Sequence, residues 1–231
     1  MNSLFSQPLT VVNAGLNGFA DNIKQANGSV IPLVWQPPVE GNIAAGLSLA
    51  ELLNHPLVEQ ANEIAFTRYL AAQPVLVDVL IAAEAIPALQ LRKTILHSGP
   101  PIAWEKMCGP VQGAILGAVL YEGWASDIAA AERLIVAGEI KLEPCHHHQA
   151  VGPMAGIISP SMPLWVIENT TNGQRAFSNF NEGLGKVLRF GANNDEVLQR
   201  LRWMQQELGP ALKAAVQKIG GLELKPLMAQ A

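Results

Sequence analysis

The most unusual chemical group of this sequence is the run Cys145, His146, His147 and His148. Thiolate and imidazole groups bind Zn²⁺ and similar metal ions, and imidazole also transfers protons near neutral pH. In an extended chain alternate side chains point to opposite faces, so only Cys145 with His147, or His146 with His148, would converge. Two ligands do not close a metal site. We therefore favour a substrate-site role over a structural loop, and both over a metal site.

A second group of candidates surrounds the apolar segment Leu164–Ile167, which is predicted to be a strand. Glu168 and Asn169 follow it directly, and ligands of open α/β sheets bind beyond the carboxyl ends of strands. Ser159 and Ser161 precede the strand and would offer hydroxyl groups to an anion. We predict that all four residues contact substrate. For the two serines, a purely structural turn is an equal alternative.

A third group of candidates combines glycines with charged side chains in the run from Asn181 to Arg189, NEGLGKVLR. Glycines let backbone N–H groups approach a ligand, and cations hold phosphate or carboxylate. The residue order of a nucleotide-binding P-loop is absent. We assign Arg175, Glu182, Lys186 and Arg189 to substrate binding, with surface cations on a helix as the alternative. Because all these unusual residues lie between positions 145 and 189, we expect them to surround one cleft.

An α/β fold is predicted to position these residues. Strand signals at Leu9–Val12 and Val30–Trp35 flank a helical stretch, Asn17–Ala26, which is the pattern of a βαβ unit. Val75–Leu80 and Thr94–His97 are predicted to form a second such unit. We expect these strands to share a mostly parallel sheet with flanking helices.

Two helical regions carry further signals. Gly109, Gly113 and Gly117 are spaced four apart and therefore share one helix face, which predicts close contact with backbone or ligand. From Asn194 onward the sequence is helical, so we expect an α/β domain at 1–193 and the start of a helical segment at 194–231. The apolar stripes of 195–208 and 210–219 cannot both face one small sheet, so we expect at least one to be bare or covered by another chain.

Composition restricts the class of protein. Hydrophobic residues make up 49% and charged residues 15%, with a mean hydropathy of +0.21. The best apolar run, Ala114–Tyr121, is far shorter than the ~20 residues of a membrane-spanning helix. We therefore expect no membrane span, but a soluble chain with surface buried against a partner or a second copy.

Charge and cysteine content indicate which partners and which compartment to expect. A net charge of −4 and a pI near 5.7 provide no basic surface for nucleic acid. The N-terminus has no basic region of a secretory signal, and two cysteines suit the reducing cytoplasm, where we expect the protein.

Three segments of the chain resemble the AllG-like (YlbE-like) family: Val12–Pro38, His97–Tyr121 and Pro144–Ala192. The resemblance implies a subunit that works with FdrA-like and AllH-like partners as oxamate carbamoyltransferase in anaerobic purine and allantoin breakdown. That enzyme splits oxalurate with phosphate into oxamate and carbamoyl phosphate. Family chains continue beyond the position of Ala231, so this chain is expected to be truncated. The resemblance supplies no catalytic residues.

The chemistry of carbamoyl transfer suits the residues chosen above. Arg175, Lys186 and Arg189 would hold phosphate or the oxamate carboxylate, and a histidine of the triplet would protonate the leaving nitrogen. Cys145 could act as a nucleophile only with a lowered pKa. We expect neither a cofactor nor a bound metal. Two alternatives remain: a structural subunit that supports a catalytic FdrA-like partner, and a metal-dependent hydrolase or lyase centred on the histidines.

Overall fold

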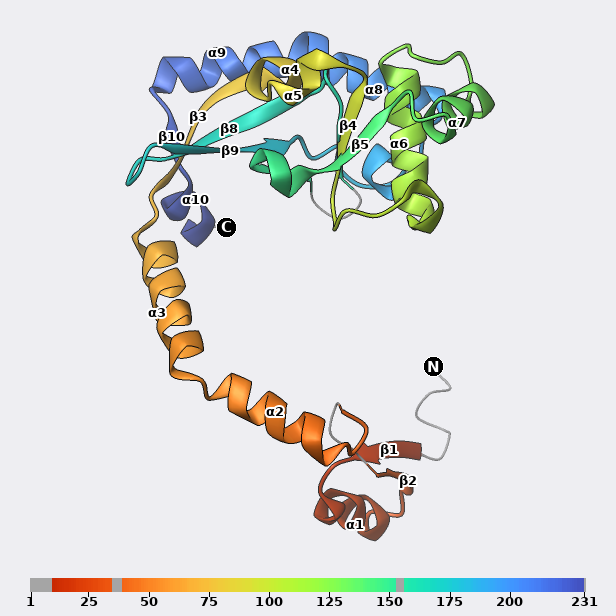
Figure 1. The fold of residues 1–231 in the computed structure, drawn as a ribbon, viewed down its shortest axis with the longest axis vertical. Coiled ribbons are helices and arrows are strands. Elements are labelled where there is room, and N and C mark those ends of the chain that lie inside the picture. The colour runs from red at the N-terminus through yellow and green to blue at the C-terminus, as the bar shows by residue number, and fades with distance from the viewer. Residues whose placement is uncertain (1–9, 35–38, 153–155, 231) are drawn as a thin grey trace. The chain divides into compact units, whose positions relative to one another are not determined.

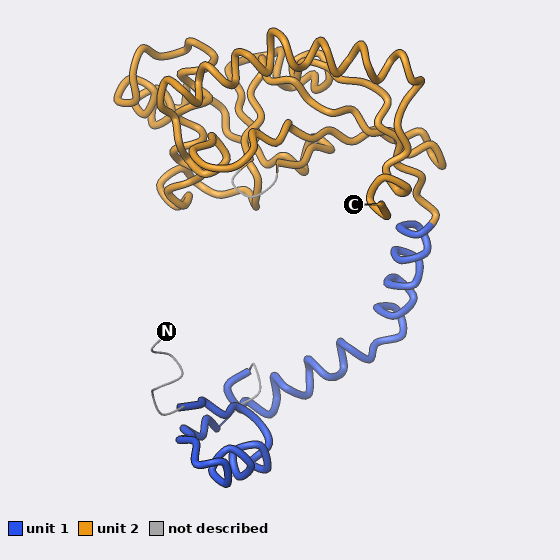
Figure 2. Tube along the Cα trace, turned by 180° about the vertical axis from the view of Figure 1, so that it is seen from behind, with its two compact units in different colours: residues 1–70 blue, residues 71–231 orange. Residues whose placement is uncertain are grey.

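The computed structural model describes residues 10–34, 39–152 and 156–230. The chain separates into two compact units, Met1–Leu70 and Ala71–Ala231, which Figure 2 colours separately. The expected strand end at Trp35 and the prolines that follow it lie outside the described residues, as does Ala231.

Unit 1 begins with the predicted βαβ pattern. Strand β1 (Thr10–Ala14), helix α1 (Asn17–Gln25) and strand β2 (Ser29–Leu33) follow one another, and the two strands pair in parallel with Val11 opposite Val30. Gly28 lies where a side chain would meet that of Ile23, which explains a glycine at the turn out of the helix. The sequence prediction of this unit is confirmed.

Two helices of unit 1 have no buried residue. Helix α2 (Ile43–Leu53) is capped by Asn42, whose side chain accepts a hydrogen bond from the N–H of Ala45 at 3.0 Å, and α3 (Pro56–Ala71) follows it. Large apolar side chains of both helices are exposed, among them Leu47, Leu52, Leu53, Leu57 and Phe66. Most helical stability in proteins comes from burial of an apolar face, and among the described residues neither of these helices buries one.

Unit 2 contains a five-stranded sheet among its described residues, in the order β10-β3-β8-β9-β6 (Figure 1). Its strands are β3 (Pro74–Ile81), β6 (Ala150–Val151), β8 (Pro163–Asn169), β9 (Gln174–Asn179) and β10 (Leu222–Glu223). Neighbours are antiparallel, except that β6 and β9 are parallel. A three-stranded sheet joins β4 (Thr94–His97) in parallel to β5 (Lys141–Pro144) and antiparallel to β7 (Ile157–Ile158).

The α/β class is confirmed, but the expectation of one mostly parallel sheet does not hold. Strands β1 and β2 form their own sheet, and β3 and β4 belong to different sheets. The main sheet is largely antiparallel because β8 and β9 form a hairpin and β3 pairs along β8, with Asp78 opposite Val166. Local patterns predict that a segment is a strand, but its partner lies far along the chain.

Helices cover the sheets of unit 2. Helix α6 (Gly109–Tyr121) packs against β4, β7 and α8, and α9 lies along β3, as Figure 1 shows. The remaining helical elements are α4 (Ala82–Ala85), α5 (Ala88–Leu91), α7 (Ile128–Val136), α8 (Asp195–Trp203), a π-helical turn (Met204–Leu208), α9 (Gly209–Ile219), α10 (Leu224–Gln230) and 3-10 turns at Trp104–Lys106, Cys145–His148 and Leu188–Phe190.

Most of both C-terminal stripes is buried or half-buried within unit 2, so the expectation of a bare or partner-covered stripe is met only at one exposed residue. Val197, Leu201 and Met204 are buried in the core of unit 2, and Val216 is buried where α9 meets β3. Helices α8 and α9 continue through the π-helical turn, whose wider winding changes which face points inward. Only the last residue of the second stripe, Ile219, is exposed. The exposed apolar surface is instead concentrated on α2 and α3.

The glycine face of α6 makes the predicted close contact at two of its three positions. A side chain on Gly113 would overlap the carbonyl oxygen of Gly191, and one on Gly117 would lie 2.5 Å from Leu188. Asn193 adds a hydrogen bond from its side chain to the carbonyl of Gly113 at 3.1 Å. At Gly109 a side chain would meet nothing within 4 Å, so the expectation fails there.

Substitution of a tightly packed glycine and of an unpacked glycine of α6 should change stability in different ways. Gly113→Ala should lower the free energy of unfolding by about 1–3 kcal/mol, because backbone must move to admit the new carbon. Gly109→Ala is the matched control and should be neutral or stabilising, because alanine is the better helix former. Chemical denaturation of both variants measures the difference. Equal stability of the two variants would contradict the packing described above.

Candidate functional site

The cysteine–histidine run is a 3-10 turn, not the extended segment expected from sequence. Cys145–His148 begins after Pro144 and ends at Gln149, whose φ is 56°. With three residues per turn, the first and last side chains of the run lie on the same side, and His146 and His147 leave the turn in other directions. The rings of those two histidines contact edge to face, with centroids 4.6 Å apart.

Cys145 lies in the protein interior. Burial raises the pKa of its thiol to about 12, so at neutral pH it is held as the thiol. A thiolate nucleophile would need the opposite shift. The apolar surroundings of Cys145 suit a core residue.

His148 is oriented by a carboxylate that sequence reasoning left out of the site. Its Nε2 atom lies 2.8 Å from Oε2 of Glu143, which also pairs with Lys141. Partial desolvation raises the pKa of Glu143, but hydrogen bonds from Lys141 and His148 outweigh it, so the pKa lies below its usual value. A carboxylate bound to imidazole fixes the ring orientation, as in sites where histidine transfers protons. The signal was local, since Glu143 lies two residues before the run.

The lowered pKa of Glu143 predicts a pH-dependent loss of stability. A carboxyl with a folded-state pKa below its usual 4.5 stabilises the fold above that pH, and this contribution is lost as pH falls through the folded value. Glu143→Gln should therefore be less stable than wild type at pH 7, by up to about 1 kcal/mol for a solvent-screened pair. The difference should vanish in acid. Denaturation curves at several pH values test this, and a difference that persists below the folded pKa would contradict it.

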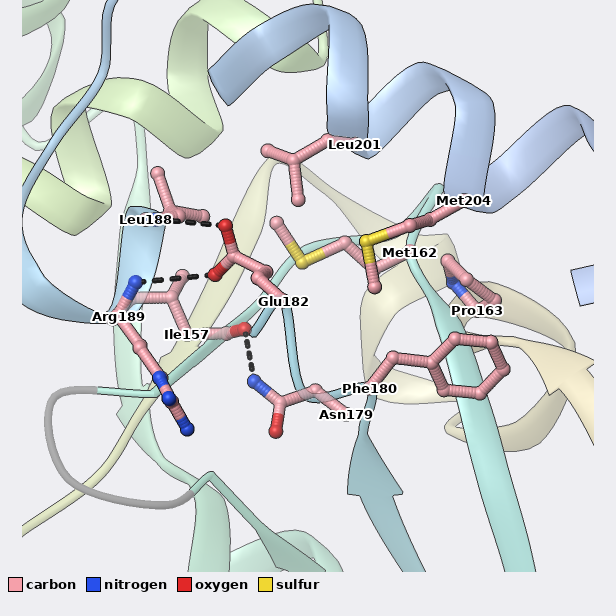
Figure 3. A pocket seen from close by; sticks show the side chains of 10 residues that line it. All are labelled: Ile157, Met162, Pro163, Asn179, Phe180, Glu182, Leu188, Arg189, Leu201 and Met204. Atoms are coloured by element: carbon pink, nitrogen blue, oxygen red, sulfur yellow. Dashed lines mark hydrogen bonds between the residues drawn. The ribbon is translucent and has the colours of Figure 1, made fainter. Parts of the chain in front are cut away.

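The predicted residues divide among separate hollows of the described part of unit 2. His146 lines one hollow together with Asn169 and Arg175. His147 and His148 line a second, with neighbours from the end of α4, the link between α4 and α5, and β9. Glu182 and Arg189 line a third, shown in Figure 3. The expectation of one shared cleft is therefore not met by these hollows.

Three of the predicted residues in the strand region, Glu168, Asn169 and Arg175, bond to protein groups. Nε of Arg175 donates to Oε2 of Glu168 at 2.9 Å across the β8–β9 pair. Oδ1 of Asn169 accepts hydrogen bonds from the backbone N–H groups of Gln73 and Thr171. Asn169 thus ties the β8–β9 turn to the start of β3, while half-exposed Arg175 retains donors that face the hollow with His146.

Ser159 and Ser161 form hydrogen bonds with a carboxylate of the protein itself. Hydroxyl groups of Ser159 and Ser161 donate to Glu122 at 2.5 and 2.7 Å, and the backbone N–H of Ser161 donates to it at 2.8 Å. Glu122 directly follows α6, so these bonds attach the end of that helix to the segment before β8. An anion would be repelled here, and the structural alternative accounts for both serines.

The run from Glu182 to Arg189 is a folded loop held by its own side chains. Both carboxylate oxygens of Glu182 accept backbone N–H groups, from Leu188 at 2.8 Å and Arg189 at 3.2 Å. Nη2 of Arg189 donates to the carbonyl of Gly183 at 2.7 Å, and Arg200 donates to the carbonyl of Lys186. Gly183 and Gly185 have φ values of 94° and 88°, which side chains rarely tolerate. The glycines therefore serve loop geometry, and the Lys186 side chain is exposed.

Asn179 lines the same hollow as Glu182 and Arg189, and sequence reasoning missed it. It ends β9, and its Nδ2 donates to the carbonyl of Ile157 at 3.2 Å. Figure 3 shows its carboxamide on the same side of the hollow as the guanidinium of Arg189, with Leu201 and Met204 on the other. A polar residue at the end of a strand, two positions before the glycine loop, was the available signal.

In residues 10–34, 39–152 and 156–230 no group of three or more His, Cys, Asp or Glu side chains is arranged to hold a metal ion. Within the same ranges, no helix combines the length and apolar character needed to cross a bilayer.

Comparison with known proteins places these features in a family. Residues 140–231, which include the histidine turn and the glycine loop, match the family model of the oxamate carbamoyltransferase subunit AllG. The Escherichia coli K12 protein of that name is 49% identical over 174 residues, 75% of this chain and 42% of the relative. The chain belongs to the AllG-like family. A second E. coli K12 protein, the uncharacterized YahG, is 43% identical over 99% of the chain and 49% of its own length.

A solved structure is similar to a large part of this chain. The crystal structure of a conserved protein of unknown function from Enterococcus faecalis V583 superposes with a TM-score of 0.71 at 47% identity. The match covers 74% of this chain and 41% of that protein. This chain spans about half the length, or less, of the relatives that it matches.

Proposed function

We propose that this AllG-like chain is part of a carbamoyl-transferring complex with FdrA-like and AllH-like subunits. The reaction is the splitting of oxalurate by phosphate into oxamate and carbamoyl phosphate, in purine and allantoin breakdown. The observation that carries the proposal is the 49% identity to an oxamate carbamoyltransferase subunit. The matched family region contains both the oriented His148 and the Arg189 loop.

The reaction makes simple demands on the protein. A phosphate oxygen forms a bond to the carbamoyl carbon, the bond from that carbon to the oxamate nitrogen breaks, and the leaving nitrogen takes a proton. Cations must hold the two anions and a proton donor must face the nitrogen. Arg175, which lines a hollow together with His146, supplies a cationic position for one anion. The histidine turn supplies the proton donor, with His148 oriented by Glu143.

Activity of the assembled complex tests the proposed reaction. The full-length protein combined with its two partner subunits should form oxamate and carbamoyl phosphate from oxalurate and phosphate. His148→Gln should reduce kcat by about 10²–10⁴-fold if the ring is the proton donor. His55→Gln is the matched control, because His55 is exposed in unit 1 and should leave kcat unchanged. An assembled complex without this activity would refute the reaction, and unchanged kcat in the His148 variant would refute the role of that residue.

The apolar faces of α2 and α3 support the subunit role. Neither helix buries a residue, so little packing stabilises either helix in water. The exposed apolar side chains include Leu47, Leu52, Leu53, Leu57 and Phe66. We therefore expect a partner chain of the complex to cover them.

Charge placed on this surface should weaken assembly. Leu52→Glu should reduce the fraction of chain that co-purifies with its partners, because burying a carboxylate without a counter-charge is costly. Leu91→Glu is the matched control, since Leu91 is an even more exposed leucine and lies in unit 2. Size-exclusion chromatography with light scattering measures both. Equal assembly of the two variants would show that α2 lies outside the interface.

A further inference from the structure

The two ring nitrogens of His148 have different surroundings. Among the described residues the side chain makes one hydrogen bond, between Nε2 and Oε2 of Glu143 at 2.8 Å. Nδ1 has no partner there, yet it is not among the buried polar atoms that lack one, so solvent reaches it. The side chain as a whole is 17% exposed. The ring is therefore mostly packed, with Nδ1 as its accessible nitrogen.

Glu143 determines which nitrogen of the neutral ring carries the hydrogen. Partial desolvation raises the pKa of Glu143, but hydrogen bonds from Lys141 and His148 outweigh it, so the group is a carboxylate at neutral pH. A carboxylate only accepts hydrogen bonds, so Nε2 donates and carries the hydrogen. The other nitrogen of a neutral imidazole then carries a lone pair. Nδ1 is thus a base that faces away from Glu143.

The carboxylate that holds the ring is itself held. Lys141 pairs with its other oxygen, Oε1, so both oxygens of Glu143 are engaged. Lys141 and Glu143 lie two residues apart on β5 and therefore share one face of that strand. The 3-10 turn that carries His148 begins where β5 ends. One strand and the turn that follows it therefore fix the direction of Nδ1 before any reactant binds.

The hollow lined by His148 suits a small planar anion. It has a volume of about 270 Å³, with His147, His148 and Gln149 as its polar lining and Ala85, Ile86, Pro87 and Phe177 as its apolar lining. None of these lining residues is acidic, so an anion meets no carboxylate on this surface. Gln149, with a φ of 56°, ends the turn in a conformation that glutamine seldom adopts and that is common at functional sites.

We propose that Nδ1 of His148 is the atom that moves the proton in carbamoyl transfer, that Glu143 is its positioning residue, and that the leaving oxamate lies in this hollow. The assignment rests on the proposed function for the identity of the reaction. It names one of the two ring nitrogens and one of the three hollows.

The proton balance of the reaction closes on this one atom. Nδ1 takes the proton of hydrogen phosphate as the phosphate oxygen bonds to the carbamoyl carbon. It gives that proton to the nitrogen as the bond between this nitrogen and the carbamoyl carbon breaks. The proton of phosphate thus ends on oxamate, and the ring returns to its starting form. Between the two transfers the ring is a cation, which the carboxylate of Glu143 stabilises.

Nuclear magnetic resonance of the histidine-labelled chain tests the ring form without any reaction. The neutral ring of His148, assigned by its loss in His148→Gln, should carry hydrogen on Nε2 and none on Nδ1. Glu143→Ala should turn it into a mixture of both forms, whereas the exposed control Glu139→Ala should leave it unchanged. A neutral ring with hydrogen on Nδ1 overturns the proposal. The wild-type spectrum decides this even if Glu143→Ala fails to fold.

The pH profile of the assembled complex tests the role of Glu143. In Glu143→Gln the acidic limb of kcat/KM should move to lower pH by about one unit, because the ring loses its proton more readily without the negative charge. Lys141 and His147 are the other titratable groups around the ring, and the α4–α5 link and β9 contribute apolar residues to its hollow. Glu139→Gln should keep the wild-type midpoint. A lower rate with an unmoved midpoint would mean a structural role and overturns the positioning role.

Chemical modification locates the oxamate. Diethyl pyrocarbonate acylates accessible, unprotonated imidazole nitrogens, so Nδ1 of His148 should react in the assembled complex. Oxamate at twice its dissociation constant should slow this reaction about threefold. Exposed His55 of unit 1 is the internal control and should react at the same rate with and without oxamate. Equal modification of His148 in both samples overturns the site. If that complex still converts oxalurate, the assignment to this hollow is wrong and the proposed function stands.

Discussion

The close approach between the glycine face of α6 and residues 188–193 determines much of unit 2. Gly113 and Gly191 meet backbone to backbone, without room for a side chain on either. This contact places the 3-10 turn Leu188–Phe190 against α6, and Glu182 then closes the loop by accepting two N–H groups of that turn. The position of Arg189 in its hollow follows from this packing, because the same turn carries its backbone.

Three carboxylates of this unit have different tasks, and one of these tasks concerns a histidine. Glu182 shapes the loop, Glu122 attaches the end of α6 to the two serines, and Glu143 orients His148. Each acid bonds to a candidate residue or to the backbone of the candidate loop. The neighbouring hydroxyl and N–H groups are therefore engaged in the fold, and the groups that remain for ligands are fewer than the sequence indicates.

The two units differ in how their apolar surface is used. In unit 2 the apolar faces of α6 and α8 and the inner face of α9 are buried by the chain itself. In unit 1 the helices α2 and α3 leave theirs in contact with solvent. Among the described residues, much of the exposed apolar surface therefore lies on α2 and α3, whereas the sequence had placed it on the C-terminal amphipathic stripes.

The sequence by itself determined the family, the α/β class, the βαβ unit at the N-terminus and the close contact at Gly113, because each depends on local pattern or on spacing along one helix. It also indicated the segment, 145–189, from which the candidate residues come. Strand partners, the direction of the main sheet and the separation of the hollows depended on contacts between distant residues such as Asp78 and Val166. Whether Ser161 faces a ligand or Glu122, and which nitrogen of His148 bonds to Glu143, was decided only by tertiary structure, because a side chain's partner is whatever the fold brings beside it.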